Sequence, residues 1–221
     1  MEHSAEILFS IGPVEITGVL VTMWVIIALL ALLSWLATRN MKDVPGPLQN
    51  LAEMAVSKLQ NYFEGVLGPK LGKEYFPIMA TLFIFIIVCN YSGLLPGAGH
   101  IKGFSVPTAS LSVTAALAIT GFFTIHTVGI REQGLKGYLK SFLSVMLPLT
   151  LVETFVRPFS LALRLFGNLF GEEMVTENLY NIFPIIVPLV MQVLSILFCL
   201  IQALVFTMLL GIYISEAAEG H

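Results

Sequence analysis

One arginine and two adjacent glutamates interrupt a long apolar stretch in the C-terminal third of the chain. The stretch from Leu161 to Val175 reads LALRLFGNLFGEEMV and places Arg164, Glu172 and Glu173 among leucine, phenylalanine and valine. A guanidinium remains charged at any pH that a protein meets, so placing it in hydrocarbon is costly unless a counter-charge is near. Ionisable residues in membrane segments mark functional sites, and ion handling is the chemistry that these residue types predict.

Further polar residues share one face of the helix that this stretch predicts. At about 100° per residue, Glu153, Arg157 and Arg164 fall within about 40° of one another, and Asn168 follows about 40° beyond Arg164. Glu153 and Arg157 are four residues apart in the favourable order, so we expect them to neutralise each other. Arg164 has only the neutral residues Ser160 and Asn168 at the equivalent spacing.

The counter-charge of Arg164 is therefore predicted to come from a separate subunit. The first three apolar segments carry no Asp or Glu in their interiors, and the last has Glu216 only at its end. A carboxylate on another helix of the same chain is the alternative, and it would make Arg164 a structural residue.

Other polar residues of the apolar segments leave two interpretations open. Glu172, Glu173 and Glu177 form either a solvated helix terminus or an approach for ions. In the last segment, Gln202 is predicted to lie level with the arginine across a helical hairpin, whereas Ser195 and its neighbour Gln192 are expected to form interhelical hydrogen bonds.

Composition places these residues in a membrane protein. Of the 221 residues, 57% are apolar and 11% are charged, which lies outside the range of soluble domains. The sequence predicts an all-α integral membrane protein, a single membrane domain of residues 1–221 with five transmembrane helices and one amphipathic interfacial helix. The expected spans are 16–38, 75–91, 106–130, 142–179 and 182–216, and the amphipathic helix is expected at 48–67.

The last two spans are too long to stand upright in a bilayer. At about 1.5 Å per residue, residues 142–179 would make roughly 57 Å of helix, nearly twice the hydrocarbon thickness. We expect a long, steeply tilted hairpin at about 55 to 60° from the membrane normal. Kinked helices are the competing geometry, with Pro148, Pro158, Pro184 and Pro188 as the candidate positions.

Basic residues predict the orientation, because short loops rich in lysine and arginine remain cytoplasmic. Only Lys102 lies in a loop on the opposite side. The N-terminus is expected outside and the C-terminus in the cytoplasm. The residues on the cytoplasmic side are Arg39, Lys42, Lys58, Lys70, Lys73, Arg131, Lys136 and Lys140.

Several classes of chemistry have no sequence support. Cys89 and Cys199 lie in apolar runs without metal-ligand spacing, so neither a metal site nor a disulfide is expected. The chain has no phosphate-binding loop, zinc-protease motif or serine-hydrolase motif, and no basic stripe for nucleic acid. We expect no cofactor.

Several motifs resemble subunit a of the F-type ATP synthases. RPFSLALRLFGNLFGEE at 157–173 and QALVFTMLLGIYISEAAEGH at 202–221 carry the resemblance, and NYSGLLPG, PTASLSVTAALA and GLKGYLK extend it along most of the chain. The family is a non-catalytic stator subunit with two aqueous half-channels, which carry H⁺ or Na⁺ to and from the carboxylates of a rotor c-ring. The implied partners are the c-ring, the peripheral-stalk b subunits, the remaining ATP synthase subunits and the lipid bilayer. The implied location is the plasma membrane of a bacterium, with a thylakoid membrane as the alternative.

The resemblance also assigns roles to individual residues. Arg164 matches the essential stator arginine, Ser160 a polar neighbour of that arginine, and Asn168, Glu173 and Gln202 match residues of the half-channels or beside the arginine.

The outward half-channel departs from the family pattern. Some bacterial members have histidine where this chain has Ser195, and Glu172 adds a second carboxylate beside Glu173. Ser110 replaces an acidic residue of chloroplast-like members, and Asn90 is a further candidate near the outer end of the second span.

Two other function classes remain as alternatives. In a self-contained ion or anion transporter, Arg164 would coordinate an anionic substrate. In a structural membrane scaffold, another helix would satisfy the polar face.

Overall fold

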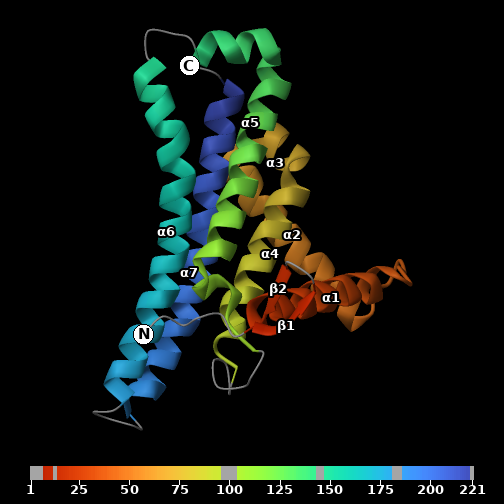
Figure 1. Ribbon diagram of the computed structural model, residues 1–221. Coiled ribbons are helices and arrows are strands. Elements are labelled where there is room, and N and C mark those ends of the chain that lie inside the picture. Colours follow the sequence, from red (N-terminus) through yellow and green to blue (C-terminus); the bar gives the residue numbers. More distant parts are fainter. Residues whose placement is uncertain (1–6, 12–13, 96–103, 143–146, 181–185, 220–221) are drawn as a thin grey trace.

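The computed structural model describes residues 7–11, 14–95, 104–142, 147–180 and 186–219 (Figure 1). Within these residues the chain forms seven α-helices, one short 3-10 helix and two short strands. Some residues of these elements lack described side chains, namely most of the strands, residues 139–142, 147–155 and 186–189, and Glu173, Thr176, Glu177, Leu179 and Tyr180.

The elements follow one another in a simple order. The strands are β1 (Ile7–Ile11) and β2 (Val14–Thr17). The helices are α1 (Gly18–Thr38), α2 (Pro47–Leu67), α3 (Pro69–Glu74), α4 (Phe76–Ser92), η1 (Pro107–Ala109), α5 (Leu111–Phe142), α6 (Leu147–Tyr180) and α7 (Ile186–Glu219).

A β-hairpin precedes the first helix, which the sequence did not predict. β1 and β2 pair antiparallel, with Ile11 opposite Val14 and Ser10 opposite Glu15. β-branched residues such as Val14 and Ile16 suit extended backbone. The first helix accordingly begins at Gly18 instead of Ile16.

The helices α4 to α7 run along one another as a bundle, and α1 projects from its side (Figure 1). Three helices of the described residues are long and apolar enough to cross a membrane: Gly18–Thr38, Leu111–Tyr138 and Val190–Glu219. α4 is apolar but has 17 residues, and α6 carries more charged residues. The expectation of five spans is therefore supported for three helices by length and composition, and remains a prediction for α4 and α6.

The helix α1 exposes most of its apolar surface. Large side chains such as Trp24, Val25 and Trp35 are more than half exposed, and its few buried residues include Thr22 and Ile26. A helix that is apolar on all sides and contacts few neighbours suits hydrocarbon surroundings. This exposure supports a membrane protein.

The two longest helices contain 34 residues each and would be about 51 Å long at 1.5 Å per residue. Pro148 and Pro188 lie in their first turns, where a backbone N–H has no intrahelical partner to lose. Pro158 lies inside α6, and the helix continues through it. Pro184 lies outside the described residues. Both helices are therefore longer than the hydrocarbon thickness of a bilayer. Their tilt relative to the membrane normal remains a prediction.

The helix α5 extends beyond its predicted end at Ile130 and changes direction at Gly134. Gly134 has φ of 74°, a conformation that only glycine adopts readily. The last segment of α5 crosses the end of the bundle (Figure 1), and the Tyr138 hydroxyl is hydrogen-bonded to His126 Nδ1. A Cβ on Gly129 would lie 2.6 Å from the Tyr138 ring, so glycine permits this close return. Phe142 therefore belongs to α5, and the following helix begins at Leu147.

The core sits between the bundle helices and the amphipathic helix α2. Every third or fourth residue of α7 is fully buried: Ala203, Phe206, Leu210 and Ile214. Among the described side chains of α6, the buried ones are Leu161, Ala162 and Leu165. These buried faces fix the rotation of both helices and thereby decide which side chains of α6 face outward.

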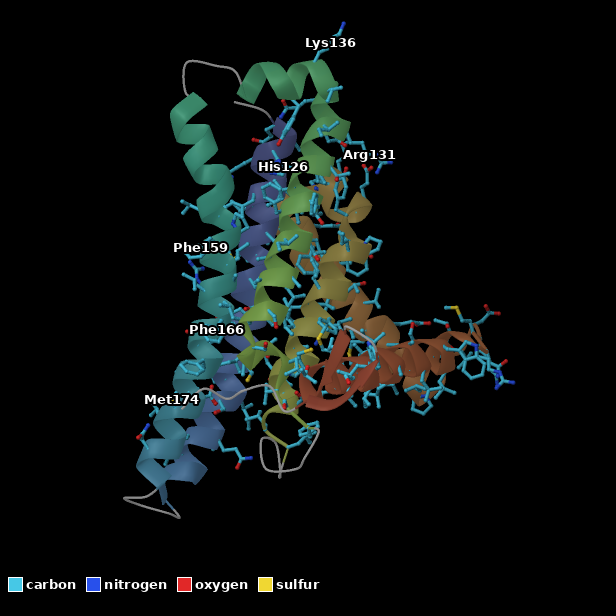
Figure 2. The ribbon with its side chains drawn as sticks, viewed as in Figure 1. His126, Arg131, Lys136, Phe159, Phe166 and Met174 are labelled. Atoms are coloured by element: carbon cyan, nitrogen blue, oxygen red, sulfur yellow. The ribbon has the colours of Figure 1, made fainter. Side chains whose placement is uncertain are left out.

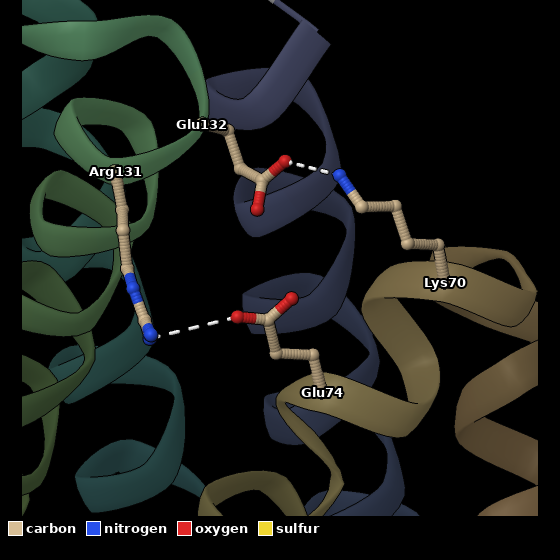
Figure 3. Close-up of polar contacts among 4 residues, drawn as sticks. All are labelled: Lys70, Glu74, Arg131 and Glu132. Carbon is tan, nitrogen blue, oxygen red and sulfur yellow. Dashed lines mark hydrogen bonds and ion pairs between the residues drawn. The ribbon is translucent and has the colours of Figure 1, made fainter.

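Two ion pairs connect α3 to α5 at one end of the bundle (Figure 3). Lys70 Nζ lies 2.7 Å from Glu132 Oε2, and Arg131 lies 3.5 Å from Glu74 Oε1. The hydrogen bond and charge of Glu132 raise the pKa of Lys70. These contacts hold the short α3, and with it the end of α2, against the bundle.

Candidate ion-translocation site

Arg164 lies on the exposed face of α6. Its neighbours Leu161 and Leu165 are buried in the core, which turns the arginine away from the bundle. Among the side chains that the structure describes, none forms a hydrogen bond or ion pair with Arg164. A permanently charged group is thus presented at the surface of a membrane protein without a described counter-charge.

Apolar side chains surround this charge. Figure 2 shows Phe159, Phe166 and Met174 along the outer edge of α6, and Phe159 is 64% exposed. The neighbouring α7 also exposes a row of apolar side chains: Val190, Val193, Leu194, Ile196, Leu197, Phe198 and Ile201. Together the described side chains of the two helices present an apolar surface that carries the guanidinium of Arg164.

Asn168 and Gln202 form a direct bond between α6 and α7. Asn168 Nδ2 donates to Gln202 Oε1 at 2.6 Å, and Gln202 is 4% exposed. The bond places Gln202 level with Asn168, one helical turn beyond the predicted position opposite Arg164. Gln202 Nε2 is buried without a hydrogen-bond partner, so a donor remains available beside the arginine's helix.

Glu172 meets Ser195 one turn further along the same pair of helices. Ser195 Oγ is hydrogen-bonded to Glu172 Oε1 and also lies 2.7 Å from the Met191 carbonyl oxygen. Ser195 is 3% exposed. The interhelical bond expected for Ser195 is therefore made to Glu172, while the Glu173 and Glu177 side chains lie outside those described.

Arg157 is bound within the chain. Its guanidinium lies 2.7 Å from Glu216 Oε2 and 4.6 Å from the centre of the Tyr213 ring, both on α7. The partner expected from the sequence, Glu153, has no described side chain. The sequence did not predict Tyr213 and Glu216 as partners of Arg157, although their three-residue spacing places them on one face of α7.

The remaining candidates lie on other elements. Asn90 of α4 is 1% exposed and donates from Nδ2 to the Cys199 carbonyl at 3.2 Å, and its Oδ1 has no partner. Gln192 Nε2 donates to the Leu94 carbonyl at 3.2 Å. Ser160 is half-buried on α6. Ser110 directly precedes α5, and its Oγ lies 2.8 Å from the Oγ of Ser112. The structure thus groups Asn168, Gln202, Glu172 and Ser195 along the α6 and α7 contact, and Asn90 of α4 contacts α7 at the Cys199 carbonyl.

The fold and these residues define an all-helical membrane protein with ionisable groups on two long apolar helices. The family described as ATP synthase A chain matches residues 20–215. ATP synthase subunit a of Geotalea uraniireducens is 44% identical over 206 residues, covering 90% of this chain and 86% of the relative. ATP synthase subunit a 3 of Pelobacter propionicus is 44% identical, with coverages of 89% and 85%. ATP synthase subunit a of Moorella thermoacetica is 40% identical, with coverages of 97% and 96%.

The chain belongs to the ATP synthase subunit a family, which confirms the resemblance that the sequence motifs indicated. It is accordingly a membrane-sector subunit that works in a complex with other ATP synthase subunits.

Proposed function

We propose that this chain is the ion-translocating stator subunit of an F-type ATP synthase. In this role it provides two aqueous half-channels, through which H⁺ or Na⁺ reaches and leaves the carboxylates of a rotor c-ring. The ATP chemistry takes place on other subunits. Ion flow is thereby coupled to rotation and to ATP synthesis.

The position of Arg164 carries this proposal. The arginine is exposed on an apolar surface, and no described side chain neutralises it. The one carboxylate that the sequence offered from the last span, Glu216, is bound to Arg157 instead. A rotor carboxylate facing α6 would supply the missing charge.

The chemistry of a fixed cation explains why such a site couples transport to rotation. A guanidinium stabilises the ionised form of a passing carboxylate and repels a free cation. Each carboxylate must therefore give up its ion on one side of Arg164 and take up another on the other side. An elementary charge that crosses the full membrane gains roughly 2.3 kcal/mol per 100 mV, and this energy drives the rotation.

The polar residues between α6 and α7 are the proposed lining of the ion path. Asn168 and Gln202 lie beside the arginine, and Glu172 with Ser195 lies further along the helices. Glu173, Ser160 and Asn90 are included as further candidates, on the resemblance and on their positions in the sequence.

The proposed setting follows from the basic loops and from the relatives. The chain is placed in a bacterial plasma membrane, with the N-terminus outside and the C-terminus in the cytoplasm. α6 and α7 lie strongly tilted against the c-ring, and the peripheral-stalk b subunits hold the chain stationary. Lys136 points away from the bundle at the end that this orientation places in the cytoplasm (Figure 2).

The test of this function is Arg164→Ala in the whole complex. Membranes carrying the change should lose ATP-driven ion pumping and ion-driven ATP synthesis, while the assembled enzyme still hydrolyses ATP. Co-purification of the variant with the rotor ring and the stalk controls for assembly. Normal coupled pumping by Arg164→Ala, or substrate uptake by the purified chain alone, would contradict the proposal.

A further inference from the structure

The outward face of α5 is apolar and ends at an arginine. Its exposed side chains, which fall within about 120° of one another around the helix, include Ile119, Phe123 and Ile130, and Phe123 is 63% exposed. The Thr127 hydroxyl on this face donates to the Phe123 carbonyl, so it is satisfied within the helix. Arg131 follows directly after Ile130. The apolar face therefore leads to a guanidinium at the end of the bundle.

The position of Arg131 suits the headgroup layer of a membrane. Figure 2 shows Arg131 at the outer edge of the bundle, and its side chain is 68% exposed. At about 1.5 Å per residue, Phe123 lies about 12 Å from Arg131 along α5, while half of the hydrocarbon layer is about 15 Å thick. With Phe123 in hydrocarbon, the arginine lies near the level of the phospholipid headgroups.

The short helix α3 adds basic residues beside this arginine. Lys70 and Lys73 lie about 60° apart around α3, and Lys73 is exposed. Where α3 meets α5, three basic groups, Lys70, Lys73 and Arg131, stand beside two carboxylates, Glu74 and Glu132. The junction, defined here as residues 69–75 with 131–132, thus carries one net positive charge.

Arg131 keeps hydrogen-bond donors available at this junction. It meets Glu74 through one terminal nitrogen at 3.5 Å, which is longer than an ordinary hydrogen bond, and a guanidinium has five N–H donors. Glu132 is bound by Lys70 at 2.7 Å. A phosphate group accepts two parallel N–H bonds from a guanidinium, so Arg131 is suited to bind one.

A buried hydroxyl at the same junction lacks a hydrogen bond. Tyr75 is 8% exposed, and its hydroxyl has no hydrogen-bond partner among the described residues. The charges of Glu74, Glu132 and Arg131 all act on this hydroxyl, which places it among them. A buried polar group costs free energy until a partner completes its hydrogen bond. The Tyr75 hydroxyl is therefore a second donor for a phosphate oxygen.

We propose that the junction binds the phosphate group of an anionic phospholipid through Arg131, Lys73 and the Tyr75 hydroxyl, and that an acyl chain lies along the exposed face of α5. Basic groups beside transmembrane helices on the cytoplasmic side suit anionic headgroups, and the proposed orientation places the junction on that side. The adjoining apolar face with Phe123 and Ile130 favours a lipid over a free phosphate ion. The inference goes beyond the proposed function and requires only that the chain lies in a membrane.

The experiment captures the lipid beside Arg131 in the complete ATP synthase complex. Ile130→p-benzoylphenylalanine introduces a photoreactive side chain, and the complex is reconstituted into vesicles with equal amounts of phosphatidylglycerol and phosphatidylcholine. Mass spectrometry then counts the cross-linked lipids. Phosphatidylglycerol should be enriched by about fivefold, the effect of one basic residue near an anionic lipid. Val25→p-benzoylphenylalanine, on the exposed α1, should capture both lipids equally. Equal capture at position 130 would overturn the proposal.

Variants in the capture background test the individual groups. Arg131→Gln should remove the enrichment, and Tyr75→Phe should reduce it by about threefold, the effect of one hydrogen bond. Lys136→Gln is the matched control, because it removes a nearby exposed cation that points away from the bundle (Figure 2). This control should retain the enrichment. An equal loss in Lys136→Gln would show a diffuse attraction between charges and would contradict a defined site.

Glu74→Gln separates lipid binding from a purely structural role. It breaks the same ion pair as Arg131→Gln, but it keeps the guanidinium and removes a competing carboxylate. The enrichment should therefore persist or increase. If Glu74→Gln loses the enrichment as Arg131→Gln does, the junction only holds α3 against α5 and the proposal fails.

Excess inorganic phosphate, added at constant ionic strength, distinguishes a lipid from a free anion. The enrichment should persist, because inorganic phosphate lacks the acyl chains that contact α5. Its disappearance would show a site for a free anion and would overturn the lipid assignment. Arg164→Ala should leave the capture unchanged, so failure of the stator function and failure of the lipid site are distinguishable.

Discussion

Arg157 and Arg164 lie on one helix and within about 20° of the same direction around it, yet their surroundings differ. Arg157 is bound to Glu216 and lies over Tyr213 of α7, with its side chain 25% exposed. Arg164, two turns further along α6, is exposed, and no described side chain forms an ion pair with it. One arginine therefore contributes to holding two helices together, whereas the other forms no ion pair with any described side chain.

The difference shows how a membrane protein can use identical residues for separate tasks. A buried ion pair offsets the cost of removing both charges from water only when both partners are present. Arg157 satisfies that condition within the chain. In the proposed function, the partner of Arg164 comes from another subunit, so the condition would be met in the assembled enzyme and not in the isolated subunit.

The largest effect is expected from removing the outward-facing charge. Arg164→Gln should abolish coupled ion pumping, whereas the melting temperature of the purified subunit without its partners should not fall, because no described contact within the chain is lost. Pumping is followed in inverted membrane vesicles and melting by intrinsic fluorescence. A clear loss of stability with pumping retained would reverse the roles of the two arginines.

A smaller effect on stability is expected from breaking the inward-facing pair. Arg157→Ala leaves the half-buried Glu216 carboxylate without its partner and should lower the unfolding free energy by about 1 to 2 kcal/mol, between the values for exposed and buried pairs. The melting temperature should fall, and residual pumping should scale with the amount of folded complex. Glu219→Gln, at an exposed position of the same helix, is the control.

The double variant Arg157→Met with Glu216→Met sharpens this result. Replacing both partners removes the unpaired charge, so stability should recover toward that of the unchanged protein. If the double variant is as unstable as Arg157→Ala, the pair is not the source of the effect.

The Tyr213 ring beside Arg157 should contribute less to the free energy of unfolding than the Glu216 carboxylate does. Tyr213→Leu keeps an apolar side chain and the Arg157 to Glu216 pair, and it removes the attraction between the guanidinium and the ring. We expect a loss of about 0.5 to 1 kcal/mol, visible as a small decrease in melting temperature. An unchanged melting temperature would show that the ring only fills space.

The smallest effect is expected at the exposed pair that joins α3 to α5. The Lys70 side chain is 75% exposed, so Lys70→Ala should change the melting temperature little, and any change should shrink as salt is added. Because the pKa of Lys70 is raised by Glu132, whatever stability the pair provides is present below the usual lysine pKa and is lost as the pH rises through the raised value. A large loss that is independent of salt would contradict this ranking.

The sequence predicted much of the helical layout. The amphipathic segment expected at 48–67 coincides with α2, whose apolar face carries the buried Phe63 and Leu67. The long last helices were expected from their length and are present in the described residues. Helical periodicity is a local property, so it can be read without knowing the neighbours.

Other features were missed because they depend on partners distant in the chain. Extended backbone at Val14 and Ile16 needs β1 beside it, and the continuation of α5 past Ile130 needs the turn at Gly134 and the contact of Tyr138 with His126. The sequence placed Gln202 opposite Arg164, whereas Gln202 is bonded to Asn168, one helical turn further along α6. The buried faces of two packed helices set their register, and the sequence alone does not show how these faces meet.

By itself, the sequence determined the class of the protein and singled out Arg164 as the residue on which the proposed function depends. Apolar segments of this length predict a membrane protein, and the absence of an acidic residue four positions from Arg164 predicts that its counter-charge comes from a separate subunit. Only the tertiary structure decided the partners: Glu216 for Arg157, Gln202 for Asn168 and Ser195 for Glu172. Each of these pairs joins α6 to α7, so the packing of the two buried faces selects it.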